Sequence, residues 1–324
     1  LDRGGVGSAD GLLAHGEGDG QGRLPGNAGT RAPVPSPRRF ARPLSRERSR
    51  PVSSSKLPIA LTIAGSDSGG GAGIQADLKT FQAFGAFGTS ALTAVTAQNT
   101  LGVTAIHPIP VEVVRAQIRA VANDLPPDAV KTGMLATREL VQAVADSLDS
   151  LEDTPCVVDP VMVASSGDRL LDREAEGAVA SDLLPRATLV TPNLHEARLL
   201  AGIEVETVDD AHRAAERLME AGAGAALVKG GHLSGSKAVD VLHHPGGERV
   251  WTRDRLDTRH THGTGCTLSA AAAAALARGV PLEDSVALAI DFVRRAMESA
   301  PGLGSGHGPL NHMVPAFPAD PPSG

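Results

Sequence analysis

The chain has 324 residues, of which 41% are hydrophobic, 21% are charged and only 2% are aromatic. Two cysteines are too few for a disulfide-stapled secreted domain, and no apolar run is long enough to span a membrane. We therefore expect a soluble, cytoplasmic protein. Six Phe, one Trp and no Tyr supply few rings, so the core has to be built mainly from Ala, Val, Leu and Ile.

Charge and residue type divide the chain into a tail and a body. Residues 1–56 contain ten Lys and Arg against five Asp and Glu, which leaves the remaining residues with 20 basic and 32 acidic side chains. A body with that balance is a poor nucleic-acid binder, because phosphates require a basic surplus. The tail is rich in Gly and Pro and poor in apolar residues, so we predict that it is disordered. An arginine-rich binding arm over 31–50 is the less favoured alternative.

From Leu57 onward, short apolar runs alternate with longer amphipathic stretches. The apolar runs predict strands over 58–64, 90–97, 156–158, 188–190 and 225–228. The amphipathic stretches predict helices over 111–123, 137–148, 208–221 and 283–299. Alternation of this kind indicates an α/β fold with a mostly parallel sheet and helices on both faces. We expect one domain over 57–314, followed by a C-terminal tail over 315–324.

A first glycine cluster follows the first predicted strand, at residues 64–73 (AGSDSGGGAG). Residues 71–76 also satisfy the dinucleotide pattern G-x-G-x-x-A, but that site needs an acid about 20 residues further on. No Asp or Glu occurs between Asp77 and Glu112, so we reject it. The cluster is either a tight packing turn or a place where the backbone approaches a ligand. In the second case Asp77 is expected to face the pocket.

A second glycine cluster, residues 260–269 (HTHGTGCTLS), precedes an alanine-rich helical stretch. Free N–H groups and the helix dipole favour an anion at such a helix start. The candidate anion hole for a transferring phosphoryl group consists of Gly263, Thr264, Gly265 and Cys266. A metal site made of His260, His262 and Cys266 is disfavoured, because a fourth ligand is missing.

Polar residues also follow three predicted strands. Asp159 comes after 156–158, Asn193 and Glu196 come after 188–190, and Lys229 comes after 225–228. Each alone is compatible with a turn or a helix cap. Because the carboxyl ends of parallel strands share one edge of the sheet, we expect them to meet there. Carboxylates that bind Mg²⁺ and a lysine beside phosphate indicate phosphoryl transfer from a nucleotide.

Taken together, these motifs resemble the bacterial hydroxymethylpyrimidine/phosphomethylpyrimidine kinases of thiamine biosynthesis, within the ribokinase-like superfamily. The matching segments are 60–80, 96–100, 131–134, 158–162, 190–196, 228–233, 260–270 and 304–309. They cover nearly the whole body and leave the tail without a counterpart. The resemblance implies a three-layer ribokinase-like fold, usually in a homodimer. It also implies phosphorylation of 4-amino-5-hydroxymethyl-2-methylpyrimidine, and then of its monophosphate, with ATP and Mg²⁺.

Residue roles follow from the same resemblance, position by position. The substrate-binding positions are Gly65, Asp77, Gln98 and Met134, with the Gln98 amide at the aminopyrimidine edge and Met134 over the ring. The positions near ATP are Asn193 and Lys229, and those near Mg²⁺ are Asp159 and Glu196.

Cys266 occupies the position at which sugar kinases of the superfamily have a catalytic aspartate. A thiol at a helix N-terminus has a lowered pKa, so we expect Cys266 to be a thiolate near neutral pH and the base for the first phosphorylation. The second acceptor is already an anionic phosphate and needs no strong base. The alternative functions are a pyridoxal/pyridoxine kinase or a non-catalytic pyrimidine-binding relative, whereas the missing aspartate makes a sugar kinase less favoured.

Overall fold

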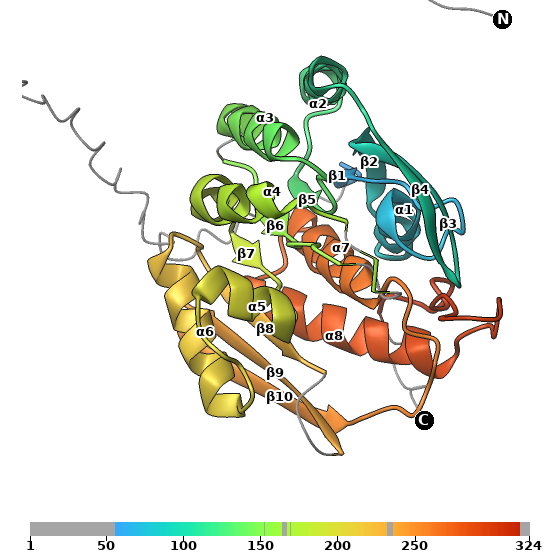
Figure 1. The fold of residues 1–324 in the computed structure, drawn as a ribbon, viewed down its shortest axis with the longest axis vertical. Coiled ribbons are helices and arrows are strands. Elements are labelled where there is room, and N and C mark those ends of the chain that lie inside the picture. Colours follow the sequence, from blue (N-terminus) through green and yellow to red (C-terminus); the bar gives the residue numbers. More distant parts are fainter. Residues whose placement is uncertain (1–55, 152, 164–166, 169, 232–235, 318–324) are drawn as a thin grey trace, which may run out of the picture. The chain divides into compact units, whose positions relative to one another are not determined.

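A central eight-stranded sheet forms the middle layer of the computed structural model, which describes residues 56–317 apart from 152, 164–166, 169 and 232–235 (Figure 1). The strand order is β10-β9-β8-β7-β6-β5-β1-β2. The strands are β1 (Ile59–Ala64), β2 (Phe87–Leu92), β5 (Ala129–Thr132), β6 (Cys156–Val158), β7 (Leu189–Val190), β8 (Ala226–Gly230), β9 (Lys237–His244) and β10 (Gly247–Asp254). Within this described sheet, β9 pairs antiparallel with both β8 and β10, and every other pairing is parallel, which confirms the predicted mostly parallel sheet.

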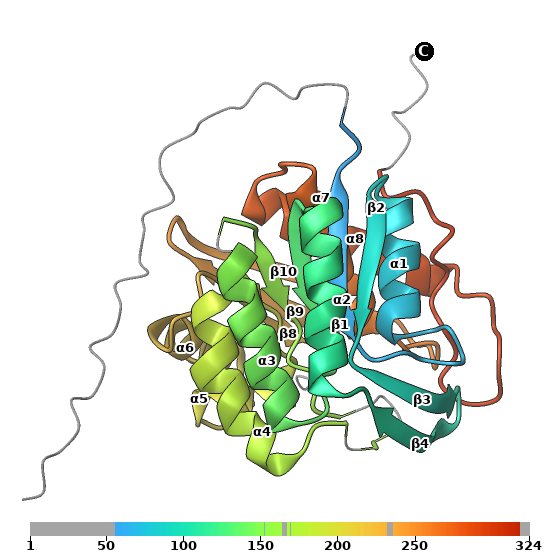
Figure 2. The ribbon, with the colours of Figure 1, turned by 90° about the horizontal axis from the view of Figure 1, so that it is seen from above.

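Helices cover both faces of the sheet (Figures 1 and 2). One face carries α1 (Gly73–Ala83), α7 (Thr264–Ala277) and α8 (Leu282–Glu298). The other carries α2 (Val111–Asp124), α3 (Arg138–Leu148), α4 (Arg173–Ala178), α5 (Leu194–Ala201) and α6 (Val208–Glu220). Successive strand residues point to opposite faces, so Val157 packs in the core below α7 and Val158 in the core below α3. The described helical segments also include two 3₁₀ helices, η1 (Asp149–Leu151) and η3 (Leu184–Arg186), and one π helix, η2 (Val179–Leu183).

The four helices predicted by range are confirmed, with each end within one residue of the prediction. Local signals explain this accuracy. The Thr137 hydroxyl accepts a hydrogen bond from the N–H of Leu140 at the start of α3. Thr207 and Asp210 form a reciprocal capping box at the start of α6, which satisfies backbone donors that a helix start otherwise leaves free.

The predicted strand over 90–97 is wrong, because the chain changes sheets in its middle. β2 ends at Leu92, and β3 (Ala94–Asn99) forms a separate antiparallel pair with β4 (Gly102–Pro108). The buried residue Thr93 makes the corner: its N–H donates to the carbonyl of Ala64, and its hydroxyl donates to the carbonyl of Met134, 2.6 Å away. All these residues suit a strand, so the break is invisible in the local pattern.

Helix α7 is buried along most of its length. Every residue over 267–275 is buried, and the six alanines over 270–275 are completely inaccessible. The helix contacts α1, α8 and the strands β1, β5 and β6. Methyl side chains on all sides let α7 approach these neighbours closely, which fixes the position of its N-terminus.

The predicted tail over 1–56 lies outside the described residues except for Lys56, whose Nζ is 3.3 Å from Oδ1 of Asp128. At the other end, residues 318–324 lie outside the described part. Ala316 is buried and the Phe317 ring packs edge-on against Phe84. Packing contacts of the body therefore extend to residue 317. No helix in the described part of the chain has the length and apolarity needed to cross a membrane.

Candidate active site

A cavity lies at the carboxyl ends of the parallel strands, at the edge where the sequence predicts a ligand site. Ten predicted site residues line it, namely Gly65, Gln98, Met134, Asp159, Asn193, Glu196, Lys229, Gly263, Gly265 and Cys266. Lys131 and His262, for which the sequence predicted no role, line it as well. The other two predicted residues, Asp77 and Thr264, are not among the lining residues.

The first glycine cluster folds around the buried carboxylate of Asp67. Its Oδ1 accepts a hydrogen bond from the N–H of Gly69 (2.8 Å), and its Oδ2 accepts from the N–H groups of Gly71 (2.9 Å) and Ala72 (2.8 Å). Burial raises the pKa of Asp67, but hydrogen bonds from His262 and from the backbone outweigh it and hold the pKa below its ordinary value. An ionised carboxylate thus organises the loop between β1 and α1.

The same carboxylate ties the first glycine cluster to the second. Nε2 of His262 donates to Oδ2 of Asp67 at 2.8 Å. Gly263 caps α7 with φ +79°, and a Cβ at this position would overlap the carbonyl oxygen of Gly71. A Cβ at Gly71 would in turn lie 2.5 Å from Cδ2 of His262. The two glycines are therefore required for the close approach of the segments.

The first turn of α7 brings its backbone towards charged residues. A Cβ at Gly265 would lie 3.3 Å from Nζ of Lys229 and 3.6 Å from Oδ2 of Asp159, so the missing side chain leaves room beside both. Thr264 is different, because its N–H and its hydroxyl both donate to the carbonyl of Thr261. Both hydrogen-bond donors of Thr264 within the predicted anion hole are therefore already paired with the carbonyl of Thr261.

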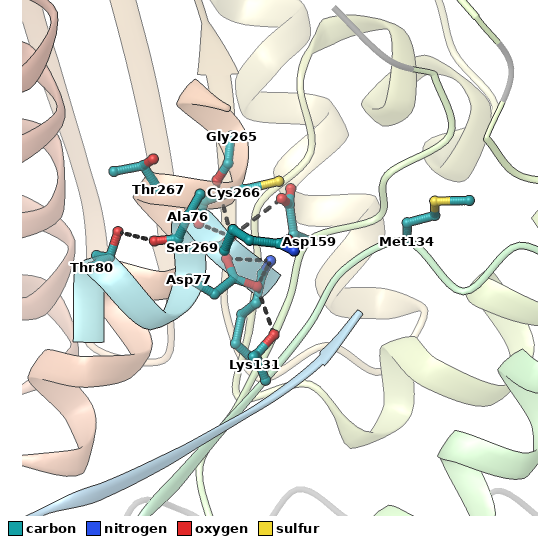
Figure 3. A network of polar contacts seen from close by, with 12 residues as sticks. Ala76, Asp77, Thr80, Lys131, Met134, Asp159, Gly265, Cys266, Thr267 and Ser269 are labelled. Atoms are coloured by element: carbon teal, nitrogen blue, oxygen red, sulfur yellow. Dashed lines mark hydrogen bonds and ion pairs between the residues drawn. The ribbon is translucent and has the colours of Figure 1, made fainter. Parts of the chain in front are cut away.

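Asp159 is the centre of a polar network below this turn (Figure 3). Its Oδ1 accepts from Nζ of Lys229 (3.3 Å) and from the hydroxyl of Thr191 (3.4 Å), and its Oδ2 accepts from the hydroxyl of Ser269 on α7 (3.2 Å). These contacts join the ends of β6 and β8 to α7 and fix the carboxylate at the cavity wall.

Glu196 is the second buried carboxylate of this group. It forms a reciprocal capping box with Asn193, in which the N–H of Asn193 donates to Oε2 of Glu196 (2.8 Å) and the N–H of Glu196 donates to Oδ1 of Asn193 (3.0 Å). Burial raises the pKa of Glu196 to about 7; Asp159 adds to this rise, whereas Lys229 opposes it. Two nearby carboxylates with oxygen donors are suited to a hard divalent cation, which would relieve their repulsion.

Asp77 does not face the cavity as the sequence predicted. Its carboxylate is completely buried, and both oxygens accept hydrogen bonds from Nζ of Lys131 at 2.8 Å, while the Thr62 hydroxyl donates to Oδ2 at 2.6 Å (Figure 3). Burial lowers the pKa of Lys131, but Asp77 outweighs this effect and raises the pKa well above its ordinary value. Asp77 is therefore buried beneath the cavity lining, where it holds the charged Lys131 side chain at the cavity.

The surroundings of Cys266, which is partly exposed at the cavity, oppose the thiolate that the sequence predicts. Burial raises the pKa of the Cys266 thiol to about 11; Lys131 and the N–H of Gly73 oppose the rise, and Asp77 and Asp159 add to it. Desolvation and two carboxylates thus outweigh the favourable contributions of Lys131 and the Gly73 N–H group. Cys266 therefore lines the cavity with a thiol whose pKa is raised rather than lowered.

The opposite part of the cavity is less polar. Met134 lies against Gly65, where a Cβ would come within 3.0 Å of its Sδ atom. The Gln98 side chain is oriented by the Thr96 hydroxyl, which donates to its Oε1 (3.2 Å) and also to the carbonyl of Ser66 (2.8 Å). A fixed amide beside a thioether and a bare backbone forms a surface for a flat, polar-edged ring.

Four residues in this region had no predicted role, namely Asp67, Lys131, His262 and Ser269. Lys131 carried the strongest signal, because a lysine between apolar residues at a strand end needs a partner. Asp67 and His262 each sit inside a glycine cluster, but nothing in the sequence indicates that they pair.

Lysine, two carboxylates and a glycine-rich helix start define the class of sites that transfer phosphoryl groups. The family model described as phosphomethylpyrimidine kinase matches residues 67–311. The chain is 49% identical over 256 residues, 79% of its length, to hydroxymethylpyrimidine/phosphomethylpyrimidine kinase of Bacillus subtilis, and covers 94% of that protein. The chain therefore belongs to the phosphomethylpyrimidine kinase family.

Solved structures agree with this assignment. An ADP complex of Bacillus subtilis pyridoxal kinase aligns with a TM-score of 0.74 and 39% identity, over 79% of this chain and 98% of that one. Phosphomethylpyrimidine kinase from Clostridium difficile aligns with a TM-score of 0.67 and 42% identity, over 74% of this chain and 99% of that one. The three-layer architecture is the ribokinase-like fold predicted from the sequence.

Proposed function

We propose that the chain transfers the γ-phosphoryl group of ATP to 4-amino-5-hydroxymethyl-2-methylpyrimidine and then to its monophosphate. The observation that carries this proposal is one cavity with two unlike parts: Lys229 and the start of α7 at one part, and Gln98, Met134 and Gly65 at the other. The family assignment supports the same reaction, and the ADP complex of the Bacillus subtilis relative supports a nucleotide as donor.

In this proposal, each group acts by position and charge. Lys229 and the N–H groups at the start of α7 stabilise charge on the transferring phosphoryl group. Lys131 adds a second fixed positive charge at the cavity wall, beside Cys266. The Gln98 amide pairs with the amino edge of the pyrimidine, while Met134 covers the ring.

Mg²⁺ is a further part of the proposal. The oxygen donors of Asp159 and Glu196 fit a hard cation, and their mutual repulsion would be relieved by one. When bound, Mg²⁺ would supply neutralising charge for the nucleotide phosphates. The role of Asp159 depends on Lys229 and Ser269, which hold its two oxygens in place.

Pyridoxal phosphorylation is the second candidate activity, because a pyridoxal kinase is among the similar structures. The experiment that separates the two offers purified protein ATP and Mg²⁺ with the pyrimidine alcohol, its monophosphate or pyridoxal, and follows products by mass spectrometry. We expect sequential mono- and diphosphate formation from the pyrimidine. Phosphorylation of pyridoxal alone would overturn the proposal, and ATP hydrolysis without any phosphorylated product would favour the non-catalytic relative.

A homodimer and a cytoplasmic location belong to this proposal as predictions. Size-exclusion chromatography with light scattering measures the first, and cell fractionation measures the second.

A further inference from the structure

Three side chains that could bind a metal ion meet at the antiparallel edge of the sheet. His212 comes from α6, His243 from β9 and Glu248 from β10. His243 and Glu248 are directly opposite in the β9–β10 register, and α6 packs against β9 (Figure 1). The side chains of His212 and His243 are 24% and 13% exposed, so both imidazoles are held by packing while one side stays open.

One ligand atom from each residue lies close to the other two. Nδ1 of His212 is 2.9 Å from Nε2 of His243 and 3.0 Å from Oε2 of Glu248, and Nε2 of His243 is 3.3 Å from the same oxygen. A single imidazole N–H can satisfy only part of this triangle, because each ring nitrogen offers either one proton or one lone pair. Ligands about 2.0–2.2 Å from a metal ion, at angles of about 90–110°, are themselves roughly 2.8–3.6 Å apart, a range that includes all three separations.

The rings and charges around this centre suit a divalent ion. The two imidazole rings meet edge to face, with centroids 5.2 Å apart and planes inclined by 70°, so neither ring is stacked over the other. Glu216 lies one turn after His212 on α6, and its charge acts on His243. Glu248 and Glu216 together supply two negative charges against a dication.

We propose that His212, His243 and Glu248 bind one divalent transition-metal ion of the zinc class, with water or Glu216 completing the coordination. Two imidazole nitrogens and one carboxylate oxygen are a common ligand set for zinc, whereas Mg²⁺ is bound mainly by oxygen.

The position indicates a structural role for this site. His243 pairs with Ala226 at the start of β8, whereas Lys229 at the cavity pairs with Asp240. Three residues of strand separate the two points by about 10 Å. The bound ion would join α6 to both strands of the β9–β10 hairpin, which forms one edge of the sheet. It would leave the chemistry of the cavity unchanged.

The test measures zinc binding by the full chain, purified without a polyhistidine tag, in the presence of excess Mg²⁺. Titration calorimetry is expected to show one Zn²⁺ per chain. The variants His243→Ala and Glu248→Gln should weaken binding by at least the roughly 10–100-fold that loss of an outer-shell partner costs. Glu248 is 60% exposed, so Glu248→Gln keeps the fold even if His243→Ala disturbs it; circular dichroism verifies both.

His244→Ala is the matched control, because this neighbouring histidine lies on the other face of β9, 3.6 Å from Glu283. It should bind zinc like the wild type. Co²⁺ in place of zinc should give the intense visible bands of a four-coordinate site in the wild type and in His244→Ala, and lose them in Glu248→Gln. Absence of zinc binding by the wild type, or equal binding by wild type and Glu248→Gln, would refute the proposal. Removal of zinc by a zinc-selective chelator should leave kinase turnover unchanged, and a parallel loss of turnover would refute the structural role.

Discussion

His262 donates a hydrogen bond to Asp67 across 195 residues of sequence, and this contact joins the loop that follows β1 to the start of α7. The pair is almost completely buried. Because Asp67 also holds three backbone N–H groups of its own loop, one carboxylate fixes the mutual position of the two glycine clusters.

We predict that Asp67→Asn lowers both turnover and stability. An amide has one acceptor oxygen, so it cannot replace all four hydrogen bonds, and an unmet buried donor costs about 1–3 kcal/mol. Displacement of the α7 start should reduce kcat by about 10²-fold, as loss of an oxyanion donor does. Urea unfolding and steady-state kinetics measure the two effects. Asp124→Asn, at the exposed end of α2, is the control, and wild-type kcat in Asp67→Asn would contradict the prediction.

The pair Lys131–Asp77 leads to a prediction about stability. Asp77→Ala leaves a buried ammonium without its partner, which costs about 3–5 kcal/mol. The double variant Asp77→Leu/Lys131→Met removes both charges and should regain most of that free energy of unfolding. It should nevertheless stay inactive, because it lacks the cavity charge of Lys131. Chemical denaturation of the three proteins decides the matter; an Asp77→Ala protein as stable as the wild type would show that the pair is not charged.

The raised pKa of Cys266 has a direct chemical consequence. A thiol that ionises at about 11 reacts slowly at neutral pH, and its alkylation rate should keep rising with pH up to that value. Iodoacetamide labelling followed by mass spectrometry measures this rate. The variant Cys156→Ala removes the other thiol, whose pKa burial raises to about 12, and isolates the signal. A rate that levels off near pH 7 would restore the thiolate expected from the sequence.

The same thiol distinguishes the two phosphorylation steps. If the thiolate form of Cys266 accepts the proton of the acceptor hydroxyl and becomes the thiol, the first step should accelerate between pH 7 and 9 as the thiolate fraction grows. The second step, on a phosphate, should not. Cys266→Ala should slow the first step by about 10²-fold and abolish its pH dependence. The ratio of the two rates in single-turnover experiments cancels effects of pH on nucleotide binding. An unchanged ratio in Cys266→Ala would exclude Cys266 as the base.

Glu196 predicts a coupling between pH, Mg²⁺ and stability. Its folded-state pKa of about 7 lies above its ordinary value of 4.5, so the native state retains the proton over this interval. Its contribution to stability is complete below pH 4.5 and is lost as the pH rises through 7, a change on the order of 3 kcal/mol. Mg²⁺ binds the ionised carboxylate, and the rise in melting temperature with Mg²⁺ should therefore be larger at pH 8 than at pH 6.

Calorimetry of the wild type and of Glu196→Gln measures this coupling. In Glu196→Gln, stability should no longer fall between pH 4.5 and 7. The rise in melting temperature with Mg²⁺ should then be the same at pH 6 and at pH 8. Glu204→Gln, at an exposed position, should behave like the wild type. An equal Mg²⁺ effect at pH 6 and pH 8 in the wild type would argue against Glu196 as a ligand.

Gly65→Ala tests the substrate part of the cavity. The added methyl would lie 3.0 Å from Sδ of Met134 and displace it from the ring position. A misfit of one methyl group costs about 1–3 kcal/mol of binding, so KM for the pyrimidine should rise at least tenfold while KM for ATP stays within twofold. An equal rise in both constants would show that Gly65 serves the whole site rather than the ring.

Much of the fold can be predicted from the sequence, because helix caps and the spacing of apolar residues are signals that involve only a few neighbouring residues. β6 has the predicted bounds, and α5 begins at the Asn193–Glu196 spacing that indicates a cap. β5 was not predicted because it contains Lys131, which is tolerated in a buried strand only through Asp77, 54 residues away. The raised pKa of Cys266 has the same origin: the helix N-terminus is visible in the sequence, but the desolvation and the carboxylates that raise the pKa exist only in the folded chain.

The alanine run of α7 contributes both to the packing of the core and to the position of the helix N-terminus at the active site. All six alanines over 270–275 are completely buried, so the core around this helix has no space for a larger side chain. A bulkier residue at Ala272 would push the helix as a rigid rod, and its N-terminus would move with it. Substitutions here should thus impair phosphoryl transfer before they unfold the protein. A position about 1.7 turns from Cys266 would then limit the tolerance of the active site to mutation.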